Sequence, residues 1–145
     1  MRTFFKSFVL FGAVAFAGCS AVSTEIASHH TVYPMKGTNT AVVGIGLDKQ
    51  GIPFVAAKEI VVEPGQKIIF AGPDEFTVVF KNKKSPNRKI DNPSRAGVVK
   101  IEVPSEIFKQ SEFVEEFRKN GQLRFNYGVI VNGKELDPEV IVRKR

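Results

Sequence analysis

The chain has 145 residues, a formal net charge of +6 at pH 7, one Cys and two His. A lone Cys excludes a disulfide within the chain, so stability has to come from core packing. The length suits a single domain with a core of its own, and a modest basic excess is a weak guide to partners.

The first 18 residues have the layout of a secretory signal peptide. Arg2 and Lys6 make a basic start, residues 8–16 are apolar and uncharged, and Ala17-Gly18 supplies the small residues of a cleavage site. The apolar run is shorter than the roughly 20 residues that span a bilayer. We therefore predict that residues 1–18 are a signal peptide that is removed on export.

The motif FAGC at residues 16–19 resembles the lipobox of bacterial lipoproteins, although Leu is usual at the position of Phe16. The resemblance implies that Cys19 carries a diacylglycerol, labels with palmitate and becomes the mature N-terminus. Ser20, in place of Asp, implies transfer to the outer membrane of a Gram-negative cell; in a Gram-positive cell the anchor is the plasma membrane. The two or three acyl chains of such an anchor hold a protein on the membrane almost permanently. The alternative is cleavage after residues 15–17, which leaves a soluble exported protein with a free thiol.

Residues 19–40 are predicted to be the lipidated Cys19 followed by a flexible tether, because residues 20–39 are small and polar without a sustained period. His29 and His30, the only histidines in the sequence, lie in this stretch with Met35. The three side chains either bind a metal ion loosely or are solvated residues of a linker.

Residues 41–145 are predicted to form one domain of short strands. AVVGIGLDKQGIPFV at 41–55 indicates two strands joined by a turn at 48–51, and EIVVEPGQKIIFAG at 59–72 repeats this arrangement around a Pro-Gly pair that suits a type II turn. EFTVVFK at 75–81 and AGVVKIEVP at 96–104 alternate apolar and polar residues, which is typical of strands with one buried face.

The last part of the domain is predicted to hold a short helix and a hairpin. SEFVEEFRKNG at 111–121 is the helix candidate, and Asn120-Gly121 is its stop signal. LRFNYGVIVNGKELDPEVIVRK at 123–144 indicates a hairpin that turns at Asn132-Gly133. The first strand of the hairpin should cross the middle of the core, because one of its faces is apolar: Leu123, Phe125, Tyr127, Val129 and Val131. About seven or eight short strands with one helix predict an all-β, Greek-key β-sandwich.

The order of these elements resembles the cupredoxin-like fold, on the segments VVEPGQKIIFAGPDEFTVVFKN at 61–82 and LRFNYGVIVNGKELDPEVIVR at 123–143. In that family a strand, a Pro-Gly-Gln turn and a strand come early, and a penultimate strand leads through a short turn to a final strand near Asp-Pro. Copper-binding members carry a Cys, two His and usually a Met. Residues 76–77 and 127–138, where these ligands are expected, contain none of them. The resemblance, which covers about residues 41–143, thus implies a metal-free scaffold.

No catalytic residue is assigned from the sequence. Ser-His-Asp and Cys-His devices need a base in the folded domain, and both histidines lie in the predicted tether. Asp74, Glu75, Glu115 and Glu116 can pair as acid and base, but close pairs also arise by chance among 15 acids. A nucleotide cofactor is not expected, because no Gly-rich phosphate loop precedes a helix.

Residues 81–95 are the most distinctive polar stretch, with one acid, Asp91, among six cations. The cations are Lys81, Lys83, Lys84, Arg88, Lys89 and Arg95. The stretch either contacts an anionic envelope component, such as phospholipid head groups, lipopolysaccharide phosphates or an acidic protein, or is a long solvated connection kept from strand pairing by Pro86 and Pro93. Nucleic acid is not expected as a partner, because no aromatic residue interrupts the basic run.

These features together predict a lipid-anchored cell-envelope protein, held at the outer membrane and facing the periplasm. It is expected to be a non-catalytic binding or structural module on a metal-free cupredoxin-like scaffold, without a cofactor. The alternative is an exported envelope enzyme or a weak metal-binding or metal-carrier protein.

Overall fold

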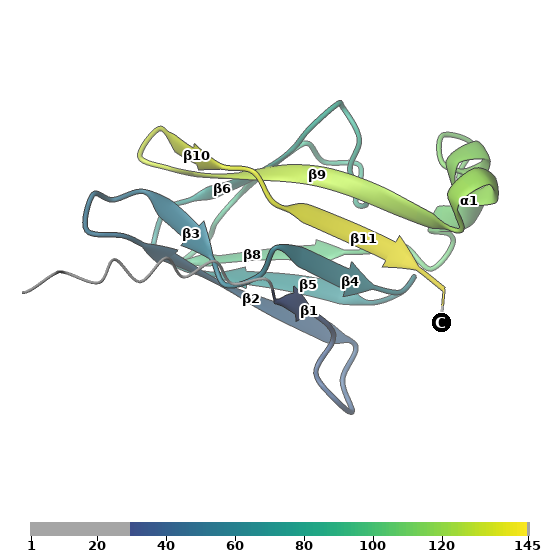
Figure 1. Cartoon of the computed structure of the whole chain (residues 1–145), viewed down its shortest axis with the longest axis horizontal. Helices are drawn as coiled ribbons and strands as arrows, with labels where there is room; N and C mark the ends of the chain where they lie inside the picture. Colours follow the sequence, from purple (N-terminus) through teal and green to yellow (C-terminus); the bar gives the residue numbers. More distant parts are fainter. Residues whose placement is uncertain (1–29, 145) are drawn as a thin grey trace, which may run out of the picture.

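The structure is a computed structural model that describes residues 30–144, and these residues form two facing β-sheets (Figure 1). The larger sheet has seven strands in the order β1-β4-β11-β9-β6-β7, with β10 paired to β9. Its strands are β1 (Thr31–Val32), β4 (Glu59–Val62), β6 (Thr77–Phe80), β7 (Asp91–Pro93), β9 (Gln122–Val131), β10 (Lys134–Leu136) and β11 (Glu139–Arg143). The smaller sheet has the order β3-β2-β5-β8. Its strands are β2 (Thr40–Leu47), β3 (Pro53–Val55), β5 (Lys67–Ala71) and β8 (Val98–Glu102).

Parallel strand pairs in both sheets define the path of the chain. β2 runs parallel to β5 in the smaller sheet, and β4 runs parallel to β11 in the larger one. Because parallel neighbours cannot be joined by a tight turn, the chain crosses from one sheet to the other between them. The predicted all-β, Greek-key β-sandwich is confirmed, with one α-helix among residues 30–144.

The Pro64-Gly65 turn joins β4 to β5. Gln66 N donates to Glu63 O at 3.1 Å, and Gly65 has a φ of 84°, the left-handed value that a type II turn requires at this position. The turn is confirmed, but the two strands do not pair with each other. Residues 60–62 are all buried, and a strand that is buried on both faces belongs inside a sheet. β4 therefore lies between β1 and β11, while β5 joins the other sheet.

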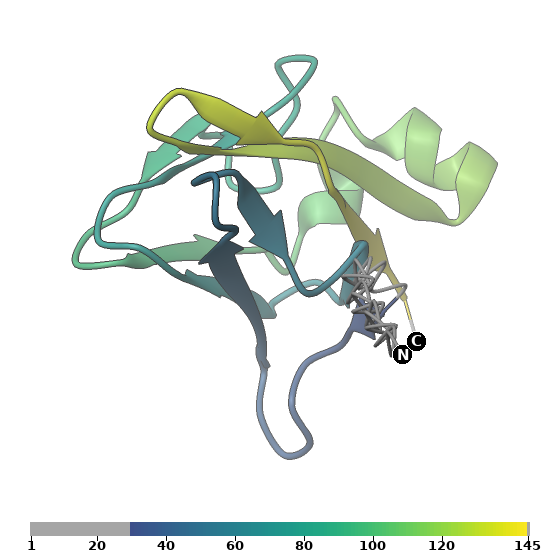
Figure 2. The same ribbon diagram turned by 60° about the vertical axis from the view of Figure 1, so that its left-hand side comes forward.

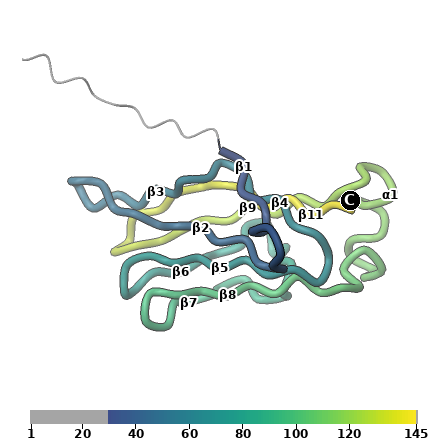
Figure 3. The backbone as a smooth tube through the Cα atoms, turned by 90° about the horizontal axis from the view of Figure 1, so that it is seen from below, coloured from purple at the N-terminus to yellow at the C-terminus, as the bar shows by residue number. Residues whose placement is uncertain are grey.

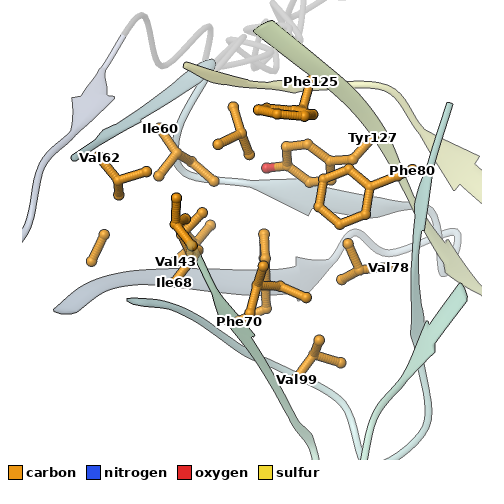
Figure 4. Packing of buried hydrophobic residues seen from close by; sticks show 14 of the residues in the cluster. Val43, Ile60, Val62, Ile68, Phe70, Val78, Phe80, Val99, Phe125 and Tyr127 are labelled. Carbon is orange, nitrogen blue, oxygen red and sulfur yellow. The ribbon is translucent and has the colours of Figure 1, made fainter. Parts of the chain in front are cut away.

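The core fills the space between the sheets (Figure 4). β9 lies between β11 and β6, and the five apolar residues predicted on its inner face are at most 2% exposed. The Phe70 and Tyr127 rings meet edge to face at a centroid distance of 5.3 Å, and the Phe113 and Phe125 rings do so at 5.4 Å. A fully buried side chain of this size stabilises the fold by about 1.5–3 kcal/mol, so β9 is the centre of the core.

The Tyr127 hydroxyl is a polar group inside this apolar cluster. Its oxygen points into the cluster in Figure 4, and it has no hydrogen-bond partner among residues 30–144. Burial raises the pKa of Tyr127 far above its ordinary value, because an apolar surrounding disfavours the tyrosinate anion. The side chain is therefore held in its neutral form.

Helix α1 (Val114–Asn120) lies at one end of the sandwich, while the β2–β3 hairpin lies at the other (Figure 3). A helix of this length is marginal by itself, so its ends have to be held. Phe113 at the N-cap is buried, and Phe117 stacks on Phe108 of the 3-10 helix η1 (Ile107–Lys109) with a centroid distance of 3.8 Å. Gly121 ends the helix with a φ of 68°. The predicted helix is confirmed.

The folded domain begins earlier than the boundary placed at residue 41. β1 pairs with β4 in parallel, and Lys58 N donates to His30 O at 3.1 Å. The turn that follows, which projects from the body of the domain in Figure 2, is closed by a hydrogen bond of 3.0 Å from Met35 N to Thr40 O. Residues 31–40 thus belong to the domain and not to a flexible tether. The short strand was missed because its two residues carry no periodicity.

The rest of the predicted tether, with His29, lies outside the described residues, as do the predicted signal peptide and Cys19. His30 and Met35 are separated by β1, and the Met35 side chain is exposed. Within residues 30–144, no helix combines the length and the apolar character that a membrane crossing requires.

Candidate functional site

The segment from residue 81 to residue 95 is held firmly against the domain. Asn92, on the edge strand β7, is buried, and its side-chain nitrogen donates to Lys89 O at 3.1 Å and to Ile90 O at 3.3 Å. Ser85 and Pro86 are buried as well. The expectation that Pro86 and Pro93 keep this stretch from strand pairing is therefore corrected, because Asp91–Pro93 form β7, which pairs with β6 and fixes the backbone there. Its six cations have different surroundings.

Lys81 lies against the β10–β11 connection. Its ammonium forms ion pairs with Glu135 and with Asp137, the latter at 3.2 Å. The hydrogen bond to Glu135 in particular raises the pKa of Lys81 above its ordinary value. The ammonium lines a hollow of about 570 Å³ in which both signs of charge occur, because Lys58, Glu59 and Glu139 line it too. Lys81 is therefore neutralised by its own neighbours.

Lys84 is a structural residue. Its ammonium forms an ion pair with Glu116 of α1, donates to Arg124 O at 2.8 Å and lies 5.0 Å from the centre of the Phe125 ring. Only 26% of the side chain is exposed. A cation engaged by a carboxylate, a carbonyl and an aromatic face is not available to a partner.

Lys83 and Arg88 line a second hollow, of about 380 Å³, between the basic segment and the residues before α1. Its other lining residues are Ser85, Ile90, Gln110, Ser111 and Glu112. Arg88 Nε donates to Gln110 Oε1 at 3.4 Å, and the Lys83 ammonium has no partner among residues 30–144. Both residues have left-handed backbone, with φ of 54° for Lys83 and 61° for Arg88. Strained backbone of this kind costs about 1–3 kcal/mol per residue and clusters at functional sites.

The two remaining cations lie outside this hollow. Lys89 follows Arg88 and is exposed, and its ammonium has no partner in the part of the chain that the structure describes. Arg95 lies after β7, where its backbone bridges to Val98 at the start of β8. Of the six predicted contact residues, Lys81 and Lys84 are thus engaged by acids of the fold, and Arg95 follows β7 in the chain. Lys83, Arg88 and Lys89 remain as the basic surface, which we call the loop surface.

Ser85 was not singled out from the sequence. Its side chain is 4% exposed, and its hydroxyl has no hydrogen-bond partner among residues 30–144. A buried hydroxyl without a partner costs free energy on the order of 1–3 kcal/mol. Gln110, Ser111 and Glu112 were missed too, because they come from a different segment and only the fold brings them to the loop. No local pattern in the sequence could have found them.

The cupredoxin-like resemblance places a copper site, where there is one, near the start of β6 and the end of β9. Thr77 at the start of β6 pairs with Ile130 near the end of β9, and a hollow beside them is lined by Glu75, Phe76, Thr77, Pro93, Ser94, Ile130 and Asn132. This set offers no thiolate, imidazole or thioether, so it does not fit a blue-copper ligand set. Residues 30–144 contain no group of three or more His, Cys, Asp or Glu side chains placed to hold a metal ion.

The four carboxylates considered as an acid and base pair are divided between two elements. Asp74 and Glu75 precede β6, whereas Glu115 and Glu116 lie on α1. Glu115 binds Arg118 at 2.7 Å, and Glu116 binds Lys84. The α1 carboxylates thus have ionic partners within the fold.

Comparisons with known proteins add a likeness to solved structures. Neither a protein-family model nor a curated protein sequence matches the chain. Among solved structures, the chain is similar to the Cu-containing nitrite reductase (NirK) from Thermus scotoductus SA-01, with a TM-score of 0.43 and 10% sequence identity. The match covers 71% of the present chain and 22% of the reductase chain, so it spans about a fifth of that protein. Copper and nitrite reduction are properties of the reductase.

Proposed function

We propose that the chain is a lipid-anchored cell-envelope protein whose β-sandwich is a non-catalytic binding module. Its anchor is the lipid on Cys19, in the outer membrane of a Gram-negative cell, and its ligand is an anionic component of the envelope. The loop surface is the binding region.

The anchor is supported by the sequence. The FAGC motif at residues 16–19 follows a basic start and an apolar run, and this arrangement explains why the only Cys of the chain stands directly after that run. An exported Cys without a partner is unusual, and a lipid attachment accounts for it.

The observation that carries the binding role is the state of the loop cations. The Lys83 and Lys89 ammonium groups have no partner among residues 30–144, and Arg88 meets only the neutral amide of Gln110, whereas Lys81 and Lys84 are neutralised by acids. Cations that the fold leaves unpaired on a fixed backbone are available to an anionic surface. Each contributes about 1 kcal/mol near an anionic membrane.

The anchor is tested by palmitate labelling in cells. Cys19→Ser should abolish incorporation of radioactive palmitate and release the protein from membranes, whereas the neighbouring Ser20→Ala should keep the label. A wild-type protein that is unlabelled and soluble would contradict the anchor and favour cleavage after residue 17.

The binding role is tested with vesicles of phosphatidylcholine, with and without phosphatidylglycerol, on the Cys19→Ser chain so that an acyl chain does not itself bind. Replacing Lys83, Lys89 and Arg88 by Gln should weaken binding to the anionic vesicles, and wild-type binding should fall with added salt. A matched triple variant at Lys36, Lys49 and Lys119 loses the same charge elsewhere. Equal loss in both triple variants would show that net charge, and not the loop surface, is responsible.

A further inference from the structure

We propose that the hollow between the basic loop and the residues before α1 is a binding site for a single phosphate group, with the Ser85 hydroxyl, the Lys83 ammonium and the Arg88 guanidinium as its ligands. The inference rests on the proposed function for the anionic nature of the ligand and names its chemical class. The phosphate belongs either to a lipid head group or to a small free phosphate compound, since both present the same oxygens.

The Ser85 hydroxyl is the first observation behind the site. Buried polar groups are nearly always hydrogen-bonded, and each exception calls for an explanation. Ser85 lines the hollow, is 96% buried and has no partner among residues 30–144. The only other buried side-chain group without a partner in that range is the Tyr127 hydroxyl, which belongs to a residue of the apolar core. At Ser85, by contrast, two cationic side chains line the same space.

The composition of the hollow favours phosphate over a carboxylate. A guanidinium presents a planar fork of donors that matches phosphate oxygens, and an ammonium adds a compact point charge. The Ser85 hydroxyl supplies a third donor. Three donors around one space suit a tetrahedral group with several oxygens better than a flat group with two. Gln110 and Ser111 line the same hollow and offer further neutral polar groups.

The backbone presents these donors in a fixed arrangement. The Asn87 side-chain nitrogen donates to Asn92 Oδ1 at 2.9 Å, and Lys89 N donates to Asn87 Oδ1 at 3.1 Å, so Arg88 lies between two anchored residues. Fixing donors before the ligand arrives reduces the entropy lost on binding.

One acid, Glu112, lines the hollow, and replacing it should change phosphate binding in the opposite direction from replacing a donor. Glu112 is exposed and places a negative charge among the donors, against two cations. Its carboxylate repels a phosphate, so Glu112→Gln should strengthen binding while every change at a donor weakens it. A purely non-specific attraction to a basic loop would respond far less to the identity of the residue.

The experiment is an NMR titration of the Cys19→Ser chain with inorganic phosphate at constant ionic strength. Amide signals of residues 83–85, 87–88 and 110–112 should shift and saturate. Ser85→Ala should weaken binding about fivefold and Arg88→Gln about tenfold, Glu112→Gln should tighten it, and Lys49→Gln in the β2–β3 turn should leave it unchanged. Ser85→Ala should also keep or raise the melting temperature, because no bond within the fold is lost and an unpartnered buried hydroxyl is removed.

Several results would overturn the site. The first is the absence of saturating shifts at the hollow. The second is shifts that Ser85→Ala and Arg88→Gln leave intact, which would mean an adventitious ion only. The third is a marked drop in melting temperature for Ser85→Ala. The lipid source is recognised if vesicles containing phosphatidylglycerol compete with phosphate, and the free source if they do not. Vesicle binding without phosphate binding would overturn this site alone, whereas phosphate binding without vesicle binding or palmitate labelling would overturn the proposed function alone.

Discussion

The Lys84 ammonium and the Glu116 carboxylate form an ion pair that joins the basic loop to helix α1. Lys84 also donates to Arg124 O on β9, so one side chain connects three elements. This arrangement separates Lys84 from Lys83, its neighbour in the sequence, whose ammonium meets nothing in the described part of the chain. Of these two adjacent lysines, Lys84 thus has a structural role, whereas Lys83 is free at the surface of the described part of the chain.

We predict that Lys84→Gln lowers the free energy of unfolding by about 1 kcal/mol, because the charged hydrogen bonds to Glu116 and Arg124 are lost from a partly covered site. Lys83→Gln is the matched control and should change it by less than about 0.5 kcal/mol. Urea unfolding measures both. Reversal of charge at all four positions 83, 84, 88 and 89 should therefore destabilise the fold through Lys84. Equal effects of the two single changes would contradict the assignment.

Alkaline pH should destabilise the protein through Tyr127. An unfolded tyrosine loses its proton near pH 10, whereas burial keeps the pKa of Tyr127 higher in the folded state. Above about pH 10 the unfolded state therefore binds fewer protons than the folded state, and the free energy of unfolding falls by up to about 1.4 kcal/mol per pH unit. Below about pH 10 tyrosine is protonated in both states, so Tyr127 causes no pH dependence there. Tyr127→Phe should lose this part of the pH dependence and, at neutral pH, raise the free energy of unfolding by about 1 kcal/mol.

Absorbance near 295 nm provides an independent measurement, because the chain has two tyrosines. Tyr33 is 54% exposed and Tyr127 is fully buried. Tyr127 should therefore add its tyrosinate absorbance only when the protein unfolds. Absorbance equal to two tyrosinates before any loss of secondary structure would contradict the burial of Tyr127.

The elements predicted well from the sequence are those whose information is local. The alternation from Leu123 to Val131 places β9 in the core because the side chains of a strand alternate between its faces, and Asn132-Gly133 supplies the positive φ values, 49° and 75°, that its turn requires. Strand pairing is not local. Whether β5 pairs with β4 or with β2 depends on which sheet buries each apolar face, so the sequence indicated the turn at Pro64-Gly65 but not the change of sheet.

The candidate site shows the same limit. Six cations within 15 residues suggested one basic patch, but the acids that neutralise two of them, Glu116 and Glu135, come from segments 32 and 54 residues away. The unpartnered hydroxyl of Ser85 is equally invisible, since burial of a serine in a polar stretch has no periodic signature. Net charge could be predicted from the sequence; the distribution of free charge required the fold.

Copper should not produce a blue-copper centre in this protein. The ligands required for such a centre are missing at the start of β6 and after β9, so the purified protein should show no intense blue absorption and no tight stoichiometric binding of Cu²⁺. Any weak binding should vanish when His29 and His30 are both changed to Ala. Calorimetry and visible absorption check this, and tight binding that survives the double change would point to ligands elsewhere in the chain.

The centre of the core should be far more sensitive to truncation than its outer surface. Phe125 is fully buried, meets the rings of Phe80 and Phe113 edge to face, and lies beneath the Lys84 ammonium. Phe125→Ala should therefore cost about 3–5 kcal/mol, as truncations of buried aromatic residues do, and this loss is enough to unfold a domain of ordinary stability. Phe54→Ala is the matched control, because that ring is 47% exposed on β3, and it should cost less than about 1 kcal/mol. Urea unfolding followed by circular dichroism measures both, and a loss at Phe54 as large as that at Phe125 would show that the outer face of the smaller sheet is covered in the folded protein.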